Sequence, residues 1–437
     1  MRNFKEKTIR QLKINQLEEK FFDYMELSDL SEVQEIIAEV KERGDDALRK
    51  FTLQFDQVKI NQFKINKEEI KHSYSFVSKD LVSNIEKSVD NIIKFSKKQL
   101  KQFRNIEYEI EQGVIVSQKI IPIERVGVYV PGGKYPLVSS LIMGAIPAKI
   151  AGVKEIAVCS PPSYEGSIYP AILVAANVCG VDEIYKIGGV QAIAAMAYGT
   201  KSIGCVDKIV GPGNIYVNMA KKAVYGRVGI DFIAGPTELL IIADKGATPS
   251  FIAADMIAQA EHDYKAKSVL VTNCCELSSM VVDELEKQLK NLKTASVAKK
   301  SLKQNGILLI VKNMDEAVEF VNRRAPEHVH IYVKNSESLI PRFKNYGSLF
   351  IGEYSSEVLG DYSSGLNHIL PTNYASRYTG GLSVKDFVKI QTILEVNKKG
   401  FCQIGSVASS LAEVEGLIGH ANAIEVRMKA LDDFICD

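Results

Sequence analysis

The chain has 437 residues, of which 46% are apolar and 24% are charged, and its formal net charge is +1. This length implies two to four domains with sizeable cores, and the near-neutral charge argues against a nucleic-acid-binding protein. No apolar run reaches the roughly 18 residues that a membrane span needs, and the N-terminus lacks the apolar segment of a secretory signal. The seven cysteines are scattered, which favours free thiols in a reducing cytoplasm over a disulfide framework.

Residues 5–104 are predicted to be helical. Apolar residues recur there at i, i+3 and i+4, most clearly in 31–44 and 80–103. Residues 1–24 are so highly charged that we expect them to form a helical arm that packs outside its own core.

From residue 125 the chain alternates short β-rich apolar runs with glycine turns and alanine-rich helical stretches. Four such runs lie within 125–237, and five more lie between ELLIIAD (238–244) and SLFIG (348–352). The alternation predicts two incomplete Rossmann-like α/β domains, each a parallel sheet flanked by helices. We assign 125–237 to the first and 25–124 with 238–385 to the second. Residues 386–437 are too few to build a core alone, so this small tail domain is expected to dock elsewhere or on a second subunit.

The expected dinucleotide fingerprint is missing. No G-x-G-x-x-G follows a predicted strand, and no P-loop motif occurs. Three glycine turns, at 130–136, 188–192 and 211–214, follow predicted strands and precede predicted helices, so each could present backbone N–H groups to a phosphate. Tight turns need glycine even without a ligand. Ligands of open α/β sheets nevertheless bind at the carboxyl ends of strands, where all three would lie.

Four histidine-containing segments are polar and acidic. They contain Gln259 with His262, Glu327 with His328, Asp361 with His368, and Glu415 with His420. Gln259 and His262 are three apart, so on a helix they share a face. A borderline metal accepts imidazole, carboxylate and amide ligands, and positions 259, 262, 361 and 420 could supply them. A single histidine on an amphipathic helix is more often a satisfied core or surface residue, and we read His72 and His330 in that way.

Glu327 and His328 are candidates for acid–base chemistry. Neighbours on a strand face opposite ways, but just after Pro326, at the start of a strand, both could reach one pocket. Histidine is a natural general base at neutral pH, and the glutamate could activate water or orient the imidazole. No G-x-S-x-G motif and no cysteine in a polar, electropositive setting occurs, which argues against covalent catalysis through serine or cysteine.

Long segments of the chain resemble histidinol dehydrogenase, from about residue 30 to the C-terminus. In order, they are RVGVYVPGG, GGVQAIAAMAYGT, VDKIVGPGNIYV, GIDFIAGPTE, AQAEHD, APEH, GDYSSGLNHILPT, GLSVKDF and EGLIGHANA. The resemblance implies a cytoplasmic homodimer that oxidises L-histidinol to L-histidine, the last step of histidine biosynthesis. It also implies two NAD+ per reaction, one zinc ion per subunit and a fold without the usual fingerprint.

The resemblance also implies roles for individual residues. The zinc ligands would be Gln259, His262, Asp361 and His420, the last from the partner subunit of the dimer. His328 would be the general base, and Glu327 would activate water to hydrate the aldehyde. Substrate contacts would come from the zinc ligands together with Thr237, His328 and Glu415, the last again from the partner. NAD would be contacted by Tyr129, Gln191 and Asn214, which lie in the glycine turns.

Two departures keep other functions open. Thr237 stands where most members of the family have serine, and SRYTGGLSV (376–384) also differs from the usual form. Both variants are similar to paralogues such as sulfopropanediol dehydrogenases, so a zinc- and NAD-dependent dehydrogenase of another small hydroxy compound is the first alternative. An anionic sulfonate would need a basic side chain near the zinc. A catalytically silent binding subunit is the second alternative, but it should have lost zinc ligands or the Glu–His pair, and all six positions are kept.

Overall fold

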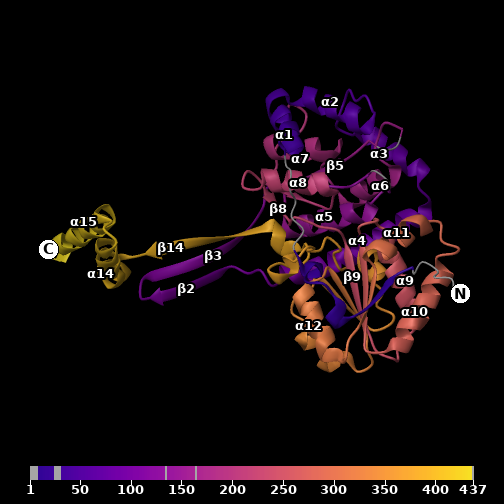
Figure 1. Ribbon diagram of the computed structural model, residues 1–437. Helices are drawn as coiled ribbons and strands as arrows, with labels where there is room; N and C mark the ends of the chain where they lie inside the picture. The colour runs from indigo at the N-terminus through magenta and orange to yellow at the C-terminus, as the bar shows by residue number, and fades with distance from the viewer. Residues whose placement is uncertain (1–7, 24–30, 133–134, 163–164, 436–437) are drawn as a thin grey trace.

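The computed structural model describes residues 8–23, 31–132, 135–162 and 165–435 (Figure 1). It contains a six-stranded sheet and a five-stranded sheet, both parallel, and a three-stranded antiparallel sheet that carries the C-terminal helices. None of the described helices is both long and apolar enough to cross a membrane.

The five-stranded sheet lies within 125–237 and has the order β6-β5-β4-β7-β8. Its strands are β4 (Arg125–Tyr129), β5 (Glu155–Ser160), β6 (Glu183–Lys186), β7 (Lys208–Val210) and β8 (Gly229–Ile230). Its connecting helices are α5 (Val138–Ala151), α6 (Pro170–Cys179), α7 (Gly189–Tyr198) and α8 (Ile215–Val224). The four strands predicted in this region are confirmed as β4 to β7.

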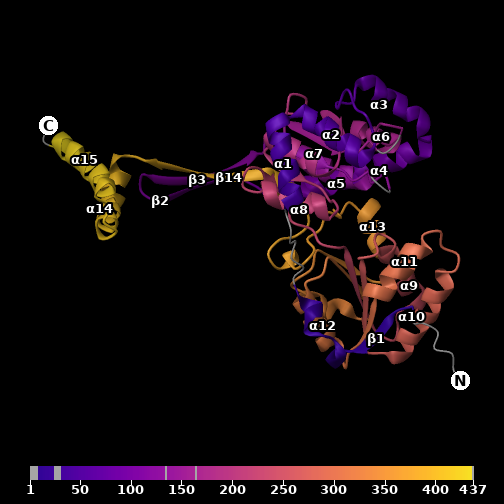
Figure 2. The same cartoon turned by 45° about the horizontal axis from the view of Figure 1, so that its top comes forward.

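The N-terminal helices also belong to this first unit. They are α1 (Ser31–Arg43), α2 (Asp45–Asp56), α3 (Lys67–Ser73) and α4 (Lys79–Leu100). Helices α1 and α2 pack on α7, while α3 and α4 pack on α6 and α5, as Figure 2 shows. The prediction that 25–124 joins 238–385 is therefore wrong. Helices α5 and α7 are buried on almost every side, and a helix that is apolar all round needs a second layer to cover it.

The six-stranded sheet has the order β1-β11-β10-β9-β12-β13. Its main strands are β9 (Glu238–Ala243), β10 (Lys267–Thr272), β11 (Ile307–Ile310), β12 (His328–Tyr332) and β13 (Ser348–Ile351), which confirms all five predicted strands. Its helices are α9 (Pro249–Ala260), α10 (Cys275–Gln288), α11 (Ala295–Asn305), α12 (Met314–Arg324) and the short α13 (Glu357–Tyr362). Single 3-10 turns occur at Tyr74–Phe76, Ser336–Ser338, Ile340–Arg342, Ala375–Arg377 and Val384–Phe387.

The predicted N-terminal helical arm is wrong in its described part. Residues Arg10–Lys13 form β1, which pairs in parallel with β11 at the edge of the six-stranded sheet. Two 3-10 turns follow, at Ile14–Gln16 and Glu19–Phe22. An edge strand can be polar because water reaches it, and its pairing partner lies about 300 residues away in sequence, so helical periodicity was a poor guide here.

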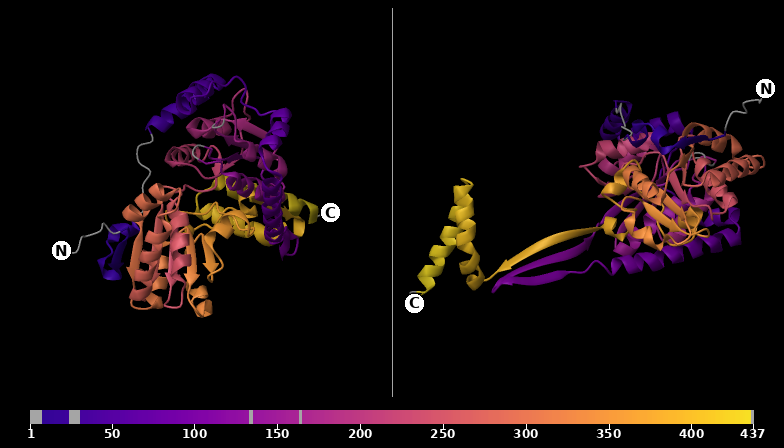
Figure 3. Two further views of the ribbon diagram at one scale, coloured as in Figure 1. Left: turned by 90° about the vertical axis from the view of Figure 1, so that its right-hand side faces the viewer. Right: turned by 60° about the horizontal axis from the view of Figure 1, so that its bottom comes forward.

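The tail stands away from the two α/β units (Figures 1 and 3). Strand β14 (Val388–Val396) pairs with β3 (Val114–Pro122), which also pairs with β2 (Ile106–Glu111). Two helices follow, α14 (Lys398–Val414) and α15 (Ile418–Ile435), and they pack on each other. The hairpin β2–β3 thus belongs structurally with the tail, although it was predicted to be part of an α/β domain.

Candidate active site

Two pockets meet near the turn at 211–214. The first pocket has a volume of about 390 Å³, and Gly211, Asn214, Thr237, Glu327 and His368 are among the residues that line it. The second pocket has a volume of about 710 Å³ and is lined by residues of both α/β units, including Tyr129, Gln191 and His262, together with Asn214 again. Asn214 therefore connects a pocket with acid–base groups to one suited to a larger ligand.

Glu327 is held in place just before β12. Its Oε2 accepts hydrogen bonds from Thr237 Oγ1 at 2.6 Å and from the Glu238 amide at 3.0 Å. Burial raises the pKa of Glu327 to about 7, although the two hydrogen bonds, which stabilise the charged form, lower it. The hydroxyl group of Thr237 therefore orients this carboxyl group.

His328 is the first residue of β12, and its surroundings fix its tautomer. Nδ1 lies 3.2 Å from the carbonyl oxygen of Glu238; a carbonyl can only accept, so the ring donates from Nδ1. Nε2 is buried and has no hydrogen-bond partner among the described residues. Burial lowers the pKa of His328, so the imidazole is neutral, with Nε2 available to take a proton. Nδ1 also lies 3.7 Å from Glu327 Oε2, so the two neighbours lie in one region, as the position after Pro326 allowed.

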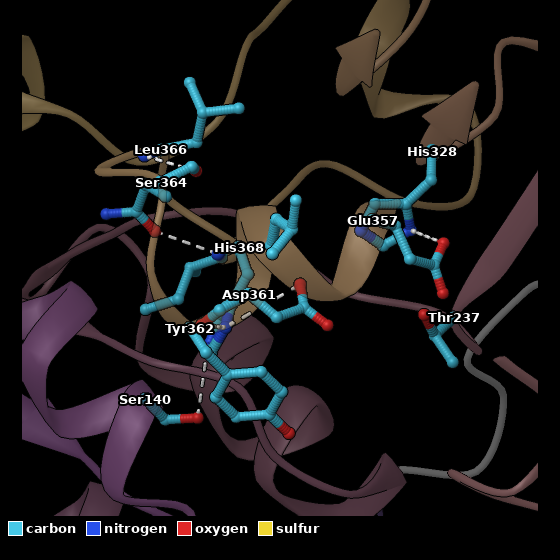
Figure 4. Close-up of polar contacts among 12 residues, drawn as sticks. Ser140, Thr237, His328, Glu357, Asp361, Tyr362, Ser364, Leu366 and His368 are labelled. Atoms are coloured by element: carbon cyan, nitrogen blue, oxygen red, sulfur yellow. Dashed lines mark hydrogen bonds and ion pairs between the residues drawn. The ribbon is translucent and has the colours of Figure 1, made fainter. Parts of the chain in front are cut away.

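Helix α13 contributes Glu357 and Asp361, one turn apart. Glu357 faces His328, with Oε2 at 4.0 Å from Nδ1, and Asp361 lies between Glu357 and His368 (Figure 4). Burial, with the charge of Asp361 added, raises the pKa of Glu357 well above its usual range. Burial likewise raises the pKa of Asp361 to about 6, against the effect of His328. The start of the helix is anchored by Ser356, whose Oγ donates to Asp255 Oδ1 at 2.9 Å.

Glu357 was missed by the sequence analysis. Its signal was present: an acid exactly one helical turn before Asp361 shares a face with it. His368 was noted without a role. Its Nδ1 lies 3.1 Å from the carbonyl oxygen of Asp361, and its Nε2 lies 3.4 Å from Ser140 Oγ. Burial lowers the pKa of His368 to about 4, so this neutral ring supports the loop that presents Asp361.

Gln259 and His262 do not lie on one helical face as predicted. Helix α9 ends at Ala260 and Glu261 caps it, so His262 follows the helix in a turn. Gln259 is buried, and its amide nitrogen donates to Thr237 Oγ1 at 2.7 Å, which leaves the hydroxyl hydrogen of Thr237 for Glu327; the other end of the amide lies 3.1 Å from Glu357 Oε1. His262 keeps one side open to the second pocket, while the protein around it desolvates the ring and lowers its pKa.

The four predicted metal ligands are not all brought together by one chain. Within the described residues, no cluster of three or more histidine, cysteine, aspartate or glutamate side chains could hold a metal. Asp361 and His262 both interact electrostatically with Glu327, and Gln259 contacts Glu357. This leaves one imidazole, one carboxylate and one amide, a nitrogen–oxygen donor set that suits a borderline metal if another ligand is added.

Glu415 and His420 lie in the tail. Glu415 caps α14 and His420 lies in α15, and both line a groove between these two helices. In all views the tail is held at the far end of the antiparallel sheet (Figure 3). Within a single chain, these two residues are therefore separated from the other predicted site residues.

The three predicted cofactor-contacting residues line the second pocket. Tyr129 ends β4, and its hydroxyl accepts a hydrogen bond from the Gly189 amide at 3.1 Å. Gln191 is buried in α7, and its Oε1 has no partner in the described part of the chain. Asn214 is the N-cap of α8 and accepts from the amide of Val217 at 3.1 Å.

The three glycine turns follow β4, β6 and β7 and so lie at the carboxyl ends of the parallel strands, as predicted. Residues 133 and 134 of the first turn lie outside the described residues. In the third turn, Gly211 has φ +121°, and a Cβ there would overlap the carbonyl oxygen of Tyr129. That position requires glycine, because the turn passes so close to β4.

Comparisons with known proteins agree with this arrangement. The family model for histidinol dehydrogenase matches residues 24–428. The chain is 45% identical to a histidinol dehydrogenase of Methanocaldococcus jannaschii over 92% of both chains. It is 46% identical to that of Streptococcus mutans, over 90% of this chain and 92% of the relative. The crystal structure of histidinol dehydrogenase from Elizabethkingia anophelis superposes with a TM-score of 0.92 at 36% identity, covering 98% of this chain and 100% of that one. The chain therefore belongs to the histidinol dehydrogenase family of oxidoreductases.

Proposed function

We propose that this chain oxidises L-histidinol to L-histidine with two NAD+, as a homodimer with one zinc site per subunit. The observation that carries the proposal is the pair Glu327 and His328, 3.7 Å apart and buried, with His328 Nε2 unpartnered among the described residues. The pair lies close to Thr237, beside two pockets that meet at Asn214. One base and one water-activating acid are what a two-step oxidation of an alcohol to a carboxylate requires.

Gln259, His262 and Asp361 would hold zinc, with His420 of the partner subunit as the further ligand. The fit rests on their nitrogen and oxygen donors and on the raised pKa of the Asp361 carboxyl group, whose charged form a nearby cation would stabilise. Zinc bound there would supply Lewis acidity and orient the nitrogen atoms of the substrate. Glu415 of the partner subunit would contact the substrate.

In the first oxidation, His328 takes the hydroxyl proton of histidinol. Its Nδ1–H is committed to the Glu238 carbonyl, so Nε2 is the atom that accepts. As this proton leaves, a dinucleotide held in the second pocket would accept the hydride from the carbinol carbon, and the product would be the aldehyde. Tyr129, Gln191 and Asn214 would position the dinucleotide for this transfer, because they line the second pocket.

In the second oxidation, Glu327 activates a water molecule. Thr237 and the Glu238 amide fix Oε2 of this carboxyl group, and a base with a pKa of about 7 is suited to the task at neutral pH. Water adds to the aldehyde to give a hydrate, and loss of the second hydride gives the carboxylate. The sum is histidinol, water and two NAD+ giving histidine, two NADH and three protons. None of the described residues lining either pocket is a cysteine, so the hydrate takes the place of a thiohemiacetal.

The departure at Thr237 does not favour a paralogous substrate. The threonine hydroxyl makes the contact to Glu327 that a serine hydroxyl could make, so the difference is one methyl group. Two lysines line the first pocket. Lys221 is paired with Asp231 at 2.5 Å and is not free to bind a sulfonate, whereas Lys265 is exposed, with its Nζ 5.9 Å from the centre of the Tyr264 ring. The curated relatives named above are histidinol dehydrogenases.

The test is the amount of NADH formed per L-histidinol consumed by the zinc-loaded protein, before and after chelation. We expect two NADH per substrate, loss of turnover on chelation and recovery with zinc. A folded, zinc-loaded dimer that leaves histidinol unchanged would contradict the proposal, and it would direct the search to small diols and sulfonates.

A further inference from the structure

Glu238 contacts both Glu327 and His328 through its backbone. Its amide donates to Glu327 Oε2 at 3.0 Å, and its carbonyl oxygen lies 3.2 Å from His328 Nδ1. Glu238 is the first residue of β9, and β12 pairs with this strand so that His328 lies opposite Leu239. A displacement of this one segment would therefore move the acid and the base together.

The side chain of Glu238 is fixed by a buried ion pair that no step above uses. Arg324 Nε donates to Glu238 Oε1 at 2.7 Å, and Arg324 Nη2 donates to Glu238 Oε2 at 3.0 Å. Both side chains are 5% exposed. Two parallel hydrogen bonds between a planar guanidinium and a carboxylate fix the orientation of the two groups, which a single ammonium group cannot do.

Arg324 is also held by two segments that are distant in the chain. Its Nη1 donates to the carbonyl oxygen of Phe21, and the centre of the Phe21 ring lies 4.8 Å from the guanidinium carbon. The centre of the Tyr374 ring lies 5.5 Å from the same carbon. Tyr374 has φ +71°, a backbone conformation that residues with a side chain rarely adopt. Because aromatic rings at such distances attract a cation, these contacts fix the guanidinium independently of Glu238.

The contacts between Glu238 and the segment 324–328 form a closed ring. Arg324 is the last residue of α12 and lies three residues before Glu327, and Ala325 turns the chain between them at φ +52°. Compared with apolar residues of similar volume, a buried ion pair often adds nothing to stability, because both charges lose their hydration. The position of this pair, on the residue that holds both Glu327 and His328, therefore favours a role in the reaction.

We propose that Arg324 is a positioning residue of the active site. It fixes the Glu238 carboxylate, and through the backbone of Glu238 it keeps the Glu327 carboxyl group and the His328 imidazole aligned for both oxidations. The N-terminal segment is part of this support, since Phe21 contacts Arg324. The inference rests on the proposed function, because it assigns a role in the same two oxidations.

The experiment measures the two oxidations separately in the zinc-loaded, full-length protein, with L-histidinol and with its aldehyde as substrates. Arg324→Lys keeps the positive charge and loses the paired hydrogen bonds. Glu238→Gln changes the opposite partner and leaves its backbone in place. Arg323→Lys is the matched control, because this arginine lies on the same helix, is 53% exposed and pairs with Glu19 of the same N-terminal segment. Near-UV circular dichroism checks folding, metal analysis checks bound zinc, and titration with NADH checks cofactor binding.

We expect Arg324→Lys and Glu238→Gln to lower kcat by about 10- to 100-fold in both oxidations, because a displacement of about 1 Å in the reacting groups can reduce a rate about 100-fold. The KM values, the zinc content and the affinity for NADH should stay close to those of the wild type, since the pair touches none of the proposed zinc ligands or cofactor contacts. Arg323→Lys should keep the wild-type kcat. A merely structural role would instead lower Tm and leave kcat unchanged at temperatures where the variants are folded.

Unchanged kcat in the folded Arg324→Lys and Glu238→Gln variants would overturn the positioning role and leave the proposed reaction standing. A loss confined to one of the two oxidations would overturn the joint alignment of Glu327 and His328. Loss of the wild-type near-UV spectrum in both variants would also overturn the proposal, because the pair would then be required for folding. Failure of the wild type to oxidise either substrate would overturn the proposed function as well.

Discussion

A buried ion pair beneath the turn at 211–214 allows a quantitative test of how the site is held. Lys221 Nζ lies 2.5 Å from Asp231 Oδ1, and both side chains are 1% exposed. The pair forms hydrogen bonds with both backbone groups of Gly211. Lys221 donates to its carbonyl oxygen at 3.0 Å, and Asp231 Oδ2 accepts from its amide at 2.8 Å. Since Gly211 and Asn214 line the first pocket, the ion pair supports the junction of the two pockets.

Replacement of one partner should be strongly destabilising. Lys221→Met leaves the Asp231 carboxylate buried, with amide hydrogen bonds from Gly211 and Phe232 but no cation. Removal of one member of a buried pair costs about 3–5 kcal/mol. In a unit of about 200 residues, that loss lowers Tm by roughly 10 °C. The double variant Lys221→Met/Asp231→Leu removes both charges, so it should lose clearly less stability than the sum of the single variants.

The assay is thermal and urea unfolding followed by circular dichroism, combined with NADH titration at a temperature where all variants are folded. Lys222→Met is the matched control, because this neighbouring lysine is exposed and should change stability by less than about 0.5 kcal/mol. NADH binding should weaken in Lys221→Met and stay unchanged in the control. Equal Tm values for the two lysine variants would contradict the stabilising role of the Lys221–Asp231 pair. So would a loss of unfolding free energy in the double variant equal to the sum of the losses in the single variants.

Three further outcomes follow from the site and from its proposed partner residues. His328→Asn should lower kcat by about 10²–10⁴ while zinc, measured by metal analysis, stays bound; normal turnover would remove His328 from its role as the base. His420→Ala and His262→Ala should each abolish activity. If each site takes ligands from both chains, as proposed, their mixed dimers should regain about a quarter of the sites; no recovery on mixing would place each site within one subunit. Asp56 has a folded-state pKa raised from 3.8 to about 6, so its ionisation destabilises the fold progressively between these two pH values and fully above about pH 6, but not near pH 3, where both the folded and the unfolded state are protonated. Asp56→Asn should therefore raise Tm at pH 8 and leave it nearly unchanged near pH 3; the same shift at both pH values would contradict this account.

The strands of the two α/β units were predictable because their chemistry is local. A central parallel strand is buried on both faces, so β9 is a continuous apolar run after its first residue, Glu238, and each of its residues is buried. Strand β1 has no such signal. Its sequence RQLK is largely exposed, and the backbone of β11 makes it a strand, through pairing that no local pattern encodes.

The sequence did not predict which sheet the N-terminal helices cover, because that choice also depends on contacts between segments distant in the chain. Periodicity in 31–44 shows that α1 has an apolar stripe, but it does not show which sheet the stripe covers. Val33, Ile36 and Val40 lie in one core cluster with Ile193 of α7. A sharper clue was the composition of the connecting helices. In α7 only the two ends lack buried side chains, so a further helical layer had to cover it.

Site residues were found where a polar group interrupts apolar sequence and missed where only the fold brings them in. Glu327 and His328 stand beside the apolar run of β12, and Gln259 lies in a helix that is otherwise rich in apolar residues. Glu357 looked like one more acid in a polar segment, and only its approach to His328 distinguishes it. Asp56 ends an ordinary amphipathic helix, and only the packing of α2 on α7 makes it a lining residue of the second pocket.

The tail supplies the strongest structural argument for the proposed sharing of sites. Strand β14 pairs with β3 over its whole length, from Val388 opposite Pro122 to Val396 opposite Val114, so the helices are carried on a continuous sheet. Glu415 and His420 flank the turn between α14 and α15, and Val414 and Ile418 around them are 86% and 66% exposed. Burial of each such side chain contributes about 1.5–3 kcal/mol. Polar residues set among exposed apolar ones are typical of a surface that is covered in an assembly. An arm that holds them away from its own Asp361 and His262 supports the proposal that they reach those of a second subunit.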